Sequence, residues 1–395
     1  MSFGHCGIDW LHSLLDYNPE ILILPELSFY RHWKVLGCDG VGREGRIFSL
    51  WMDHFNSSNR QNPDVKMFSS DDESTRFSEL FLTEIKKNGI GRKEIFKSIH
   101  IAYANVKKIK FTDIKVIIAH EHVSYPFKHA IEDFDQSKIL MIIRDPRASL
   151  AGFFRGITKK VGHLPDYHEY YYNMSMEEWL NGRDIWKYNS NWLGQRLKII
   201  QNENMVNDLK SEMKDLAKWL EIKFTEGLLK RTYRDGKTAF VDSSYLKKSS
   251  SLEKNYFKPE NIRKRWLKEL SDQREILMIE TLFKDIMKSF GYKSMVKTTL
   301  FNYIKGIYYF LLPHRGPRRL MYYRPDEDEI KRTLNRLIIS NKNLQAYILK
   351  HMPKGMQSAY IWLLSVINHI RIYFLPKDRW VRYDNPSINE TYRNY

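Results

Sequence analysis

The stretch Lys138-Ile-Leu-Met-Ile-Ile-Arg-Asp-Pro-Arg-Ala-Ser-Leu-Ala-Gly152 decides the fold class. Its apolar run, residues 139–143, is short enough for a buried strand, and it ends abruptly at Arg144 before a helical pattern. Arg144 therefore stands at the carboxyl edge of a sheet, where open α/β folds bind their ligands. A planar, permanently charged guanidinium favours a phosphate ligand there. The alternative is a turn arginine that caps the strand through a surface ion pair.

Two further apolar segments predict that this strand belongs to a parallel sheet. Residues 21–24 and 115–119 have the length and composition of short buried strands. Helical patterns over about 43–110 and 126–134 separate them from each other and from the strand before Arg144. Strands that alternate with helices are typical of a parallel sheet covered by helices.

The composition indicates a folded, basic protein. Of the 395 residues, 43% are hydrophobic and 28% are charged, which is the balance of a globular chain. The net charge of +17 implies an anionic partner such as nucleic acid, lipid headgroups, or a phosphorylated or sulfated ligand. Cys6 and Cys38 are the only cysteines, which excludes a disulfide framework and a four-cysteine zinc site. With neither a signal sequence nor an apolar run of roughly 18 residues, we expect a cytoplasmic protein.

The last hundred residues differ in character from the rest. Residues 304–313 and 367–376 are apolar helix ends that close on proline, and arginine and tyrosine follow both of them. This weak repeat predicts a main domain at 1–296 and a basic, aromatic-rich helical region at 297–395. Its composition is that of an interfacial membrane anchor, so we expect a peripheral contact with anionic membrane. The alternative is an ordinary helical appendage that packs on the main domain or on another subunit.

A glycine-containing loop opens the first helix of the chain. It reads Gly4-His5-Cys6-Gly7-Ile8-Asp9-Trp10, and the helical pattern that follows places Trp10, Leu11, Leu14 and Leu15 on one face. A helix N-terminus carries unpaired N–H groups and a partial positive charge, so this backbone can bind an anion without any particular side chain. Asp9 would repel a sulfate unless its side chain turns away as a helix-opening residue.

Together, this loop and the Arg144 edge resemble the sulfotransferases that use 3′-phosphoadenosine 5′-phosphosulfate (PAPS). In that family a segment Gly-x-x-Arg/Lys-Ser-Gly-Thr-Thr-x-Leu cradles the 5′-phosphosulfate, and a strand ending in Arg-x-Pro holds the 3′-phosphate. The resemblance extends through residues 192–224 and 249–292, and so covers roughly residues 1–292. It implies an α/β, P-loop-like three-layer sulfotransferase fold with a central parallel sheet, followed here by a helical C-terminal appendage.

The resemblance also implies a reaction and a donor site. The reaction transfers a sulfuryl group from PAPS to a hydroxyl of a carbohydrate or glycolipid, requires no metal, and involves no nucleic acid. The partners that it implies are the nucleotide donor and a glycan or lipid-linked acceptor, and the composition of the C-terminal region adds an anionic membrane. The residues that match the family's donor-binding positions are Gly4, His5, Cys6, Gly7, Ile8, Asp9, Trp10, Arg144, Gly152 and Arg263.

Several positions depart from the family pattern. His5 and Cys6 stand where the family has Arg or Lys and then Ser, and Ile8 and Asp9 replace two threonines. A histidine supplies a full positive charge only when protonated. Gly152 stands where the family has a serine eight residues after the arginine, and almost no strand precedes the loop, so either that strand is very short or the natural start lies upstream of Met1. The alternative function is a catalytically degenerate member that binds nucleotide, a partner or a membrane.

The candidate catalytic base lies in His120-Glu121-His122, directly after the strand at 115–119. Alternation along an extended segment puts the two histidines on one side and Glu121 on the other. We favour His122 because imidazole has a suitable pKa, with His120, Glu121 and His5 as the other catalytic candidates. The alternatives are a structural histidine at the strand end and a metal site, which is disfavoured because no third ligand has zinc spacing.

Two other patterns are weaker. Residues 40–45 fit Gly-x-Gly-x-x-Gly, but no convincing strand precedes them, and a Gly-x-x-x-x-Gly-Lys-Ser/Thr segment is absent from the sequence. Neither a dinucleotide fold nor a nucleoside triphosphatase is therefore favoured. The basic, aromatic residues 318–324 could stack on nucleic acid bases, yet no binding module surrounds them.

Overall fold

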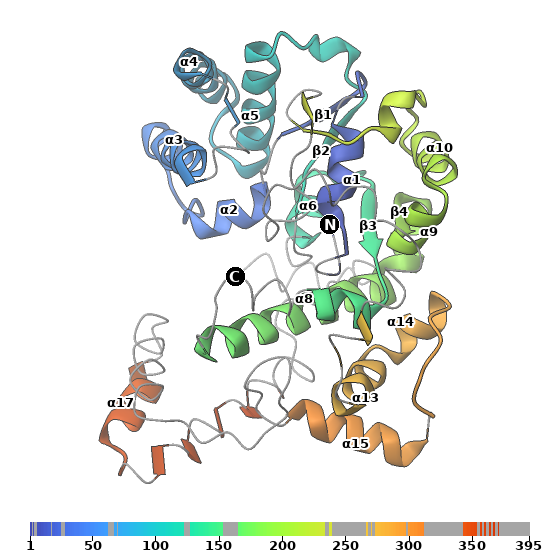
Figure 1. Ribbon diagram of the computed structural model, residues 1–395. Coiled ribbons are helices and arrows are strands. Elements are labelled where there is room, and N and C mark those ends of the chain that lie inside the picture. The colour runs from blue at the N-terminus through green and yellow to red at the C-terminus, as the bar shows by residue number, and fades with distance from the viewer. Residues whose placement is uncertain are drawn as a thin grey trace. The chain divides into compact units, whose positions relative to one another are not determined.

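The computed structural model forms two compact units, which are described one at a time (Figure 1). Unit 1 consists of Met1–Arg144 and Ser190–Pro259, and unit 2 of Asp145–Asn189 and Glu260–Tyr395. The boundary predicted between 296 and 297 remains a prediction. The structure describes residues 1, 3, 6–16, 18–24, 28–61, 67–68, 70–121, 127–152, 165–233, 237–238, 266–267, 270, 273–297, 299–311, 343–353, 356–357, 359–360, 363–364, 366–367 and 370.

The strands of unit 1 form parallel pairs, as the sequence predicts. β1 (Ile21–Ile23) pairs with β2 (Val116–Ile118), and β3 (Ile139–Ile143) pairs with β4 (Leu197–Gln201). A short antiparallel pair, β5 (Thr232–Tyr233) and β6 (Lys237–Thr238), follows later in the chain. All three residues of β1 are buried, and so are four of the five in β3, which explains their nearly continuous apolar sequences.

The first residues of the chain extend the β3–β4 pair. The N–H of Phe3 donates to the carbonyl of Ile142 at 3.4 Å, and the N–H of Ile142 donates to the carbonyl of Met1 at 3.3 Å. Ile142 thus bonds both Met1 and Phe3, two residues apart in the chain, which is the hydrogen-bond pattern of parallel strands. Met1 and Phe3 therefore lie beside β3, just before the glycine-containing loop.

Most of unit 1 is helical around this sheet. Its helices are α1 (Ile8–Leu15), α2 (Phe29–Val35), α3 (Glu44–Gln61), α4 (Asp71–Asn88), α5 (Arg92–Val106), α6 (Phe127–Asp133), α9 (Asn202–Asn207) and α10 (Leu209–Leu220), with short 3-10 turns η2 (Phe111–Asp113), η3 (Gly194–Arg196) and η4 (Glu226–Leu229). The helical pattern over 43–110 is confirmed as α3, α4 and α5. The Gly-x-Gly-x-x-Gly segment follows α2, a helix, so it lacks the strand that a dinucleotide site requires.

Aromatic packing joins the helices that cover β1 and β2. Phe29 of α2 stacks on Trp51 of α3, with ring centroids 5.2 Å apart, and both side chains are fully buried. Phe77 and Phe81 of α4 belong to the same core, and α4 runs along α5 (Figure 1). Each such ring removes a large apolar area from water, which is what keeps this part of unit 1 folded.

The described regular secondary structure of unit 2 is helical. It contains a helix at 146–152, most of α8 (Pro165–Leu193), α13 (Gln273–Leu282), α14 (Lys284–Ser289), α15 (Leu300–Leu311) and α17 (Asn343–His351). The fully buried Trp179 of α8 packs on Phe283, with centroids 5.2 Å apart. Gly291, with φ of 73°, follows α14 in the left-handed conformation expected of a helix-ending glycine.

Candidate functional site

Three chain segments meet at the carboxyl edge of the β3–β4 pair in unit 1. Cys6 follows Phe3, which is hydrogen-bonded to Ile142 of β3. Arg144 follows β3, and Asn202 follows β4, whose Gln201 lies opposite Ile143. The side-chain Nδ2 of Asn202 donates to the buried carbonyl of Cys6 at 3.0 Å. The loop before α1 is therefore tied to the sheet edge that carries Arg144.

Gly7 makes this close approach possible. Its φ of 98° lies in the left-handed region, and a Cβ there would lie 2.5 Å from the Nδ2 of Asn202. A larger residue would suffer both backbone strain and a clash. Gly7 is also the N-cap of α1 and has no side chain to occupy that position, so the first-turn N–H groups of α1 face the loop. The other predicted loop residues, Gly4 and His5, lie outside the described part of the chain.

Arg144 has the features of an anion-binding residue. Its guanidinium Nε is buried and has no hydrogen-bond partner among the residues that the structure describes. A buried donor without an acceptor costs free energy, and a charged donor costs more than a neutral one. The site therefore gains stability from an anion that accepts this bond.

Arg147, three residues later in unit 2, is a paired structural residue. Asp145 caps the helix at 146–152 by accepting from the Arg147 N–H at 2.9 Å, and its carboxylate also pairs with the Arg147 guanidinium at 2.7 Å. The buried Glu280 pairs with the same guanidinium at 2.6 Å, and its planar group lies 4.6 Å from the Trp266 ring centroid. An arginine engaged in an ion pair at a turn, the alternative given for Arg144, is thus what the structure shows at Arg147. For Arg144 both interpretations stay open.

Two histidines and an aspartate meet beside the opening of α1. The Nδ1 atoms of His12 and His120 are 2.5 Å apart, so one ring must donate to the other. The Nε2 of His120 lies 3.6 Å from a carboxylate oxygen of Asp9, whose side chain is 48% exposed. This carboxylate favours a proton on Nε2 of His120, which makes its Nδ1 the acceptor and His12 the donor. Asp9 is therefore directed toward His120.

Glu121 has a structural role in unit 1. Its carboxylate is fully buried, and it accepts from the N–H of Tyr30, in the first turn of α2, at 2.7 Å. Burial raises the pKa of Glu121 from 4.5 to about 8, although the hydrogen bond from Tyr30 acts in the opposite direction. His120 and Glu121 thus contact different helices, as strand alternation predicts. His122 lies outside the described residues.

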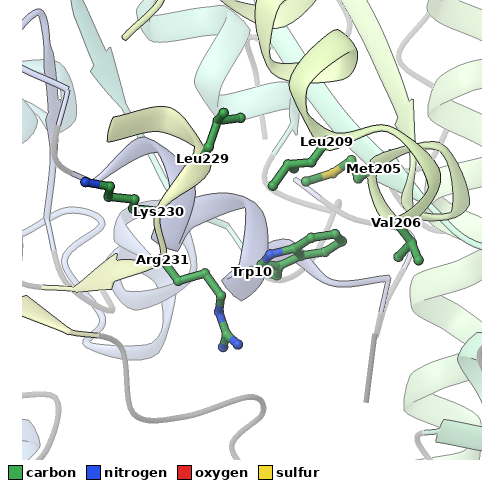
Figure 2. Close-up of a pocket in the computed structure, with 7 residues that line it drawn as sticks. All are labelled: Trp10, Met205, Val206, Leu209, Leu229, Lys230 and Arg231. Atoms are coloured by element: carbon green, nitrogen blue, oxygen red, sulfur yellow. The ribbon is translucent and has the colours of Figure 1, made fainter. Parts of the chain in front are cut away.

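A cavity of about 510 Å³ opens beside α1 in unit 1. Trp10, Met205, Val206, Leu209, Leu229, Lys230 and Arg231 line it. Figure 2 shows the Trp10 indole between the apolar side chains of Met205 and Leu209 and the guanidinium of Arg231, whereas Lys230 extends away from the indole. An aromatic plane with apolar walls and nearby cations suits a flat, anionic ligand such as a nucleotide.

The remaining predicted donor residues are in unit 2 or undescribed. Gly152 is the last described residue of the helix at 146–152, and Ser149 of that helix is buried and accepts from the Trp179 Nε1 at 3.1 Å. Arg263 lies outside the described residues. The sequence interpretation missed His12, Asn202 and Arg231. Asn202 was detectable because it directly follows a strand, at the same edge as Arg144.

A family model for the sulfotransferase domain matches residues 46–291, which is more than half of the chain. The chain belongs to the sulfotransferase domain family. The match includes β2, β3, β4 and Arg144, and it begins after the loop at 4–10. As family membership implies, this sulfotransferase is a transferase that needs a sulfate donor and an acceptor. Its parallel α/β fold agrees with the sequence prediction.

Two solved structures are similar to this sulfotransferase. The sulfotransferase domain from the curacin biosynthetic pathway is 15% identical, with 73% of this chain and 95% of that chain covered and a TM-score of 0.46. The sulfotransferase domain from the Synechococcus PCC 7002 olefin synthase is 16% identical, with 67% and 84% covered and a TM-score of 0.41. No curated protein matches the chain.

Two further observations concern the described residues as a whole. No cluster of three or more His, Cys, Asp or Glu side chains within the described part of this sulfotransferase could hold a metal ion. None of the helices in that same part combines the length and apolar character needed to cross a bilayer.

Proposed function

We propose that this sulfotransferase moves the sulfuryl group of PAPS to a hydroxyl of a carbohydrate or glycolipid. The acceptor oxygen forms a bond to sulfur while the bond from sulfur to the 5′-phosphate oxygen breaks. The leaving adenosine 3′,5′-bisphosphate takes the electron pair, and the acceptor proton passes to a base. Like phosphoryl transfer, this reaction depends on aligning the two oxygens and neutralising the leaving charge.

The donor site rests on the carboxyl edge of unit 1. In our proposal the N–H groups from Cys6 to Trp10 bind the 5′-phosphosulfate, and Arg144 binds the 3′-phosphate. The single observation that carries the proposal is the buried Nε of Arg144, which has no hydrogen-bond acceptor in the described part of the chain and could donate to a ligand. The cavity beside Trp10, about 510 Å³ in volume, is within the usual range for small-molecule sites and supports a bound nucleoside.

The nearby charges support stabilisation of the leaving phosphate. The dipole of α1 contributes partial positive charge at Gly7, and Arg231 adds a guanidinium on the cavity wall. An additional proton on the His12–His120 pair would add positive charge beside the same helix, and the Asp9 carboxylate, 3.6 Å from Nε2 of His120, would stabilise that charged form. This pair offers a substitute for the loop cation that the sequence lacks, and we propose the predicted His5 as a second source of charge.

We assign the base to His122 by elimination. Both ring nitrogens of His120 face protein groups, namely His12 and Asp9, and Glu121 accepts from the backbone of α2. His122, two residues beyond His120, is then the remaining titratable side chain of that segment. A neutral imidazole near pH 7 is a suitable acceptor for the hydroxyl proton.

The acceptor class and the cellular place are also proposals. A carbohydrate or glycolipid acceptor is supported by the resemblance of the loop, the Arg144 edge and the segments after them to PAPS-dependent sulfotransferases. We propose a cytoplasmic protein that is peripheral to the membrane, with Gly152 and Arg263 as further donor-binding residues. The net charge of +17 and the basic residues of 297–395 support contact with an anionic surface.

Donor binding is tested by calorimetric titration of adenosine 3′,5′-bisphosphate. We expect micromolar affinity for the native chain and a loss of about tenfold to hundredfold in Arg144→Ala, because a charged hydrogen bond disappears. The matched control is Arg92→Ala, which removes an equal charge from an ion pair with Asp133 in unit 1. Equal affinity of the native chain and Arg144→Ala would contradict the proposed site.

Catalysis is tested with labelled PAPS and a panel of glycans and glycolipids. We expect acceptor-dependent release of the bisphosphate, and we expect His122→Ala to lower kcat by about a hundredfold or more without changing bisphosphate affinity. His12→Phe should lower kcat less, since it removes only the partner of His120. Tight bisphosphate binding with no transfer to any acceptor would favour the catalytically degenerate alternative.

A further inference from the structure

Helix α15 of unit 2 has one face that is fixed by packing on α13. Gly306 and Phe310 are its buried residues. A Cβ at Gly306 would lie 2.1 Å from the Oγ1 of Thr281, so only glycine permits this approach of the two helices. The orientation of α15 on unit 2 is therefore determined by close contact.

The opposite face of α15 is apolar and exposed. Leu300, Phe301, Ile304 and Tyr308 are 76%, 71%, 59% and 56% exposed. Their spacing of one, four and eight residues from the first puts them on the same side of the helix, and we call them the α15 apolar face. Large apolar side chains that gather on one exposed surface mark an interaction site more often than ordinary protein surface.

The chain that leads into and forms α15 carries charges of one sign. From Ile286 to Leu311 the chain contains Lys288, Lys293, Lys297 and Lys305 and no acidic residue, and the next acidic residue is Asp326. The Lys305 ammonium lies 5.9 Å from the ring centroid of Phe301, so its aliphatic stem follows the aromatic surface. Apolar and aromatic side chains with lysines beside them match a partner that is apolar within and anionic at its surface.

We propose that the α15 apolar face docks unit 2 on an anionic membrane surface. The 12 residues of α15 span about 18 Å, which is much less than the roughly 30 Å of a bilayer core, so the helix lies in the plane of the interface. Leu300, Phe301 and Ile304 enter the boundary between headgroups and acyl chains, while Lys305 and Lys297 meet the phosphates. This proposal rests on the proposed function, because it brings the enzyme to the place where a lipid-linked acceptor would lie.

The charge pattern favours lipid over a second copy of the chain. In a two-fold symmetric dimer the same surface meets itself. Lys305 of one copy would then approach the like-charged surroundings of the other, with no acid between Ile286 and Leu311 to compensate. An anionic lipid surface has no such repulsion.

The test is co-sedimentation of the full chain with vesicles. Vesicles of phosphatidylcholine alone are compared with vesicles that also contain phosphatidylglycerol, at about 0.15 M and about 1 M salt. We expect binding to the anionic vesicles, weakened by salt, and a loss of at least tenfold in the triple variant Leu300→Ser, Phe301→Ser and Ile304→Ser. Lys305→Glu should weaken binding to the anionic vesicles by about fivefold or more.

The control is Phe111→Ser, which removes an aromatic side chain that is 41% exposed on unit 1 and should leave vesicle binding unchanged. The proposal is overturned if the native chain ignores anionic vesicles, or if the triple variant binds them equally well. It is also overturned if sedimentation velocity shows a dimer that the triple variant abolishes, since a second copy then covers the face. Titration of adenosine 3′,5′-bisphosphate into the triple variant should give native affinity, which separates a failure here from a failure of the donor site.

Discussion

Arg144 and Arg147 are three residues apart in one segment, yet their surroundings are opposite. Arg147 is buried between the carboxylates of Asp145 and Glu280 and lies over Trp266. Arg144, at the end of β3, has a buried Nε with no acceptor among the described residues. We propose that Arg144 binds a ligand, whereas Arg147 is paired within unit 2.

The difference teaches that an arginine is assigned by its partners and not by its place in a motif. A paired, buried guanidinium has its charge and hydrogen bonds satisfied within the protein, so it has little left to offer an anion. A buried guanidinium nitrogen without an acceptor costs free energy, and an anion that accepts from it removes that cost. Substitutions at the two positions should therefore change different quantities, one the free energy of unfolding and the other the affinity for nucleotide.

The largest expected effect is on stability, at Arg147. Arg147→Met removes the cation that pairs with the buried Glu280 and the partly buried Asp145, which should lower the free energy of unfolding by on the order of 3–5 kcal/mol. Urea denaturation measures it. Arg92→Met, which opens a more exposed pair, should cost about 1 kcal/mol or less. If adding Glu280→Gln to Arg147→Met restores no stability, the buried pair is not the cause.

A smaller effect on stability is expected at Glu121. Glu121 is a buried acid like Glu280, but it accepts a hydrogen bond from the backbone N–H of Tyr30, whereas Glu280 pairs with the cation Arg147. Its pKa is raised by burial from 4.5 to about 8, so in the folded state it stays protonated at a pH where the unfolded chain ionises. The contribution of Glu121 to the free energy of unfolding is therefore fully present below about pH 4.5, and it is lost as the pH rises through 8. Glu121→Gln should remove this decline and stabilise the protein at pH 8 by on the order of 1–3 kcal/mol. The test compares the denaturation midpoints of the native chain and of Glu121→Gln at pH 5 and at pH 8. If the midpoint changes equally between the two pH values in both proteins, Glu121 is not the cause of the decline.

Substitution of Gly7 should change the free energy of unfolding least. It also tests the Arg144 edge of the sheet, because Gly7 contacts Asn202 at that edge. Gly7→Ala should cost about 1–2 kcal/mol for the left-handed backbone, and it should also weaken bisphosphate binding because the new Cβ displaces Asn202 from the loop. Gly40→Ala is the matched control, since Gly40 has φ of 75° but open space around it. It should lose similar stability and bind nucleotide normally. Identical binding by both variants would separate Gly7 from the donor site.

Local patterns in the sequence predict much of the fold. The strands at Ile21–Ile23, Val116–Ile118 and Ile139–Ile143 are short apolar runs with polar ends, and the helices between them carry their own periodicity. Asp145 and Pro146 also predict the helix start after β3, because both residues favour the first positions of a helix.

The arrangement of the site depends on contacts that no local pattern encodes. His12 meets His120 across 108 positions, and Asn202 meets Cys6 across 196. The different surroundings of Arg144 and Arg147 also depend on a distant residue, because Glu280, which pairs with Arg147, lies 133 positions away in the sequence. The catalytic and donor-binding roles assigned to individual residues stay predictions.

The most direct test of the central claim compares two ligands on two proteins. Adenosine 3′,5′-bisphosphate and adenosine 5′-monophosphate differ only in the 3′-phosphate that Arg144 is proposed to bind. By calorimetry, the native chain should prefer the bisphosphate by about tenfold to hundredfold, and Arg144→Ala should bind the two ligands almost equally while unfolding at the same urea concentration as the native chain. A preference that survives in Arg144→Ala would contradict the account.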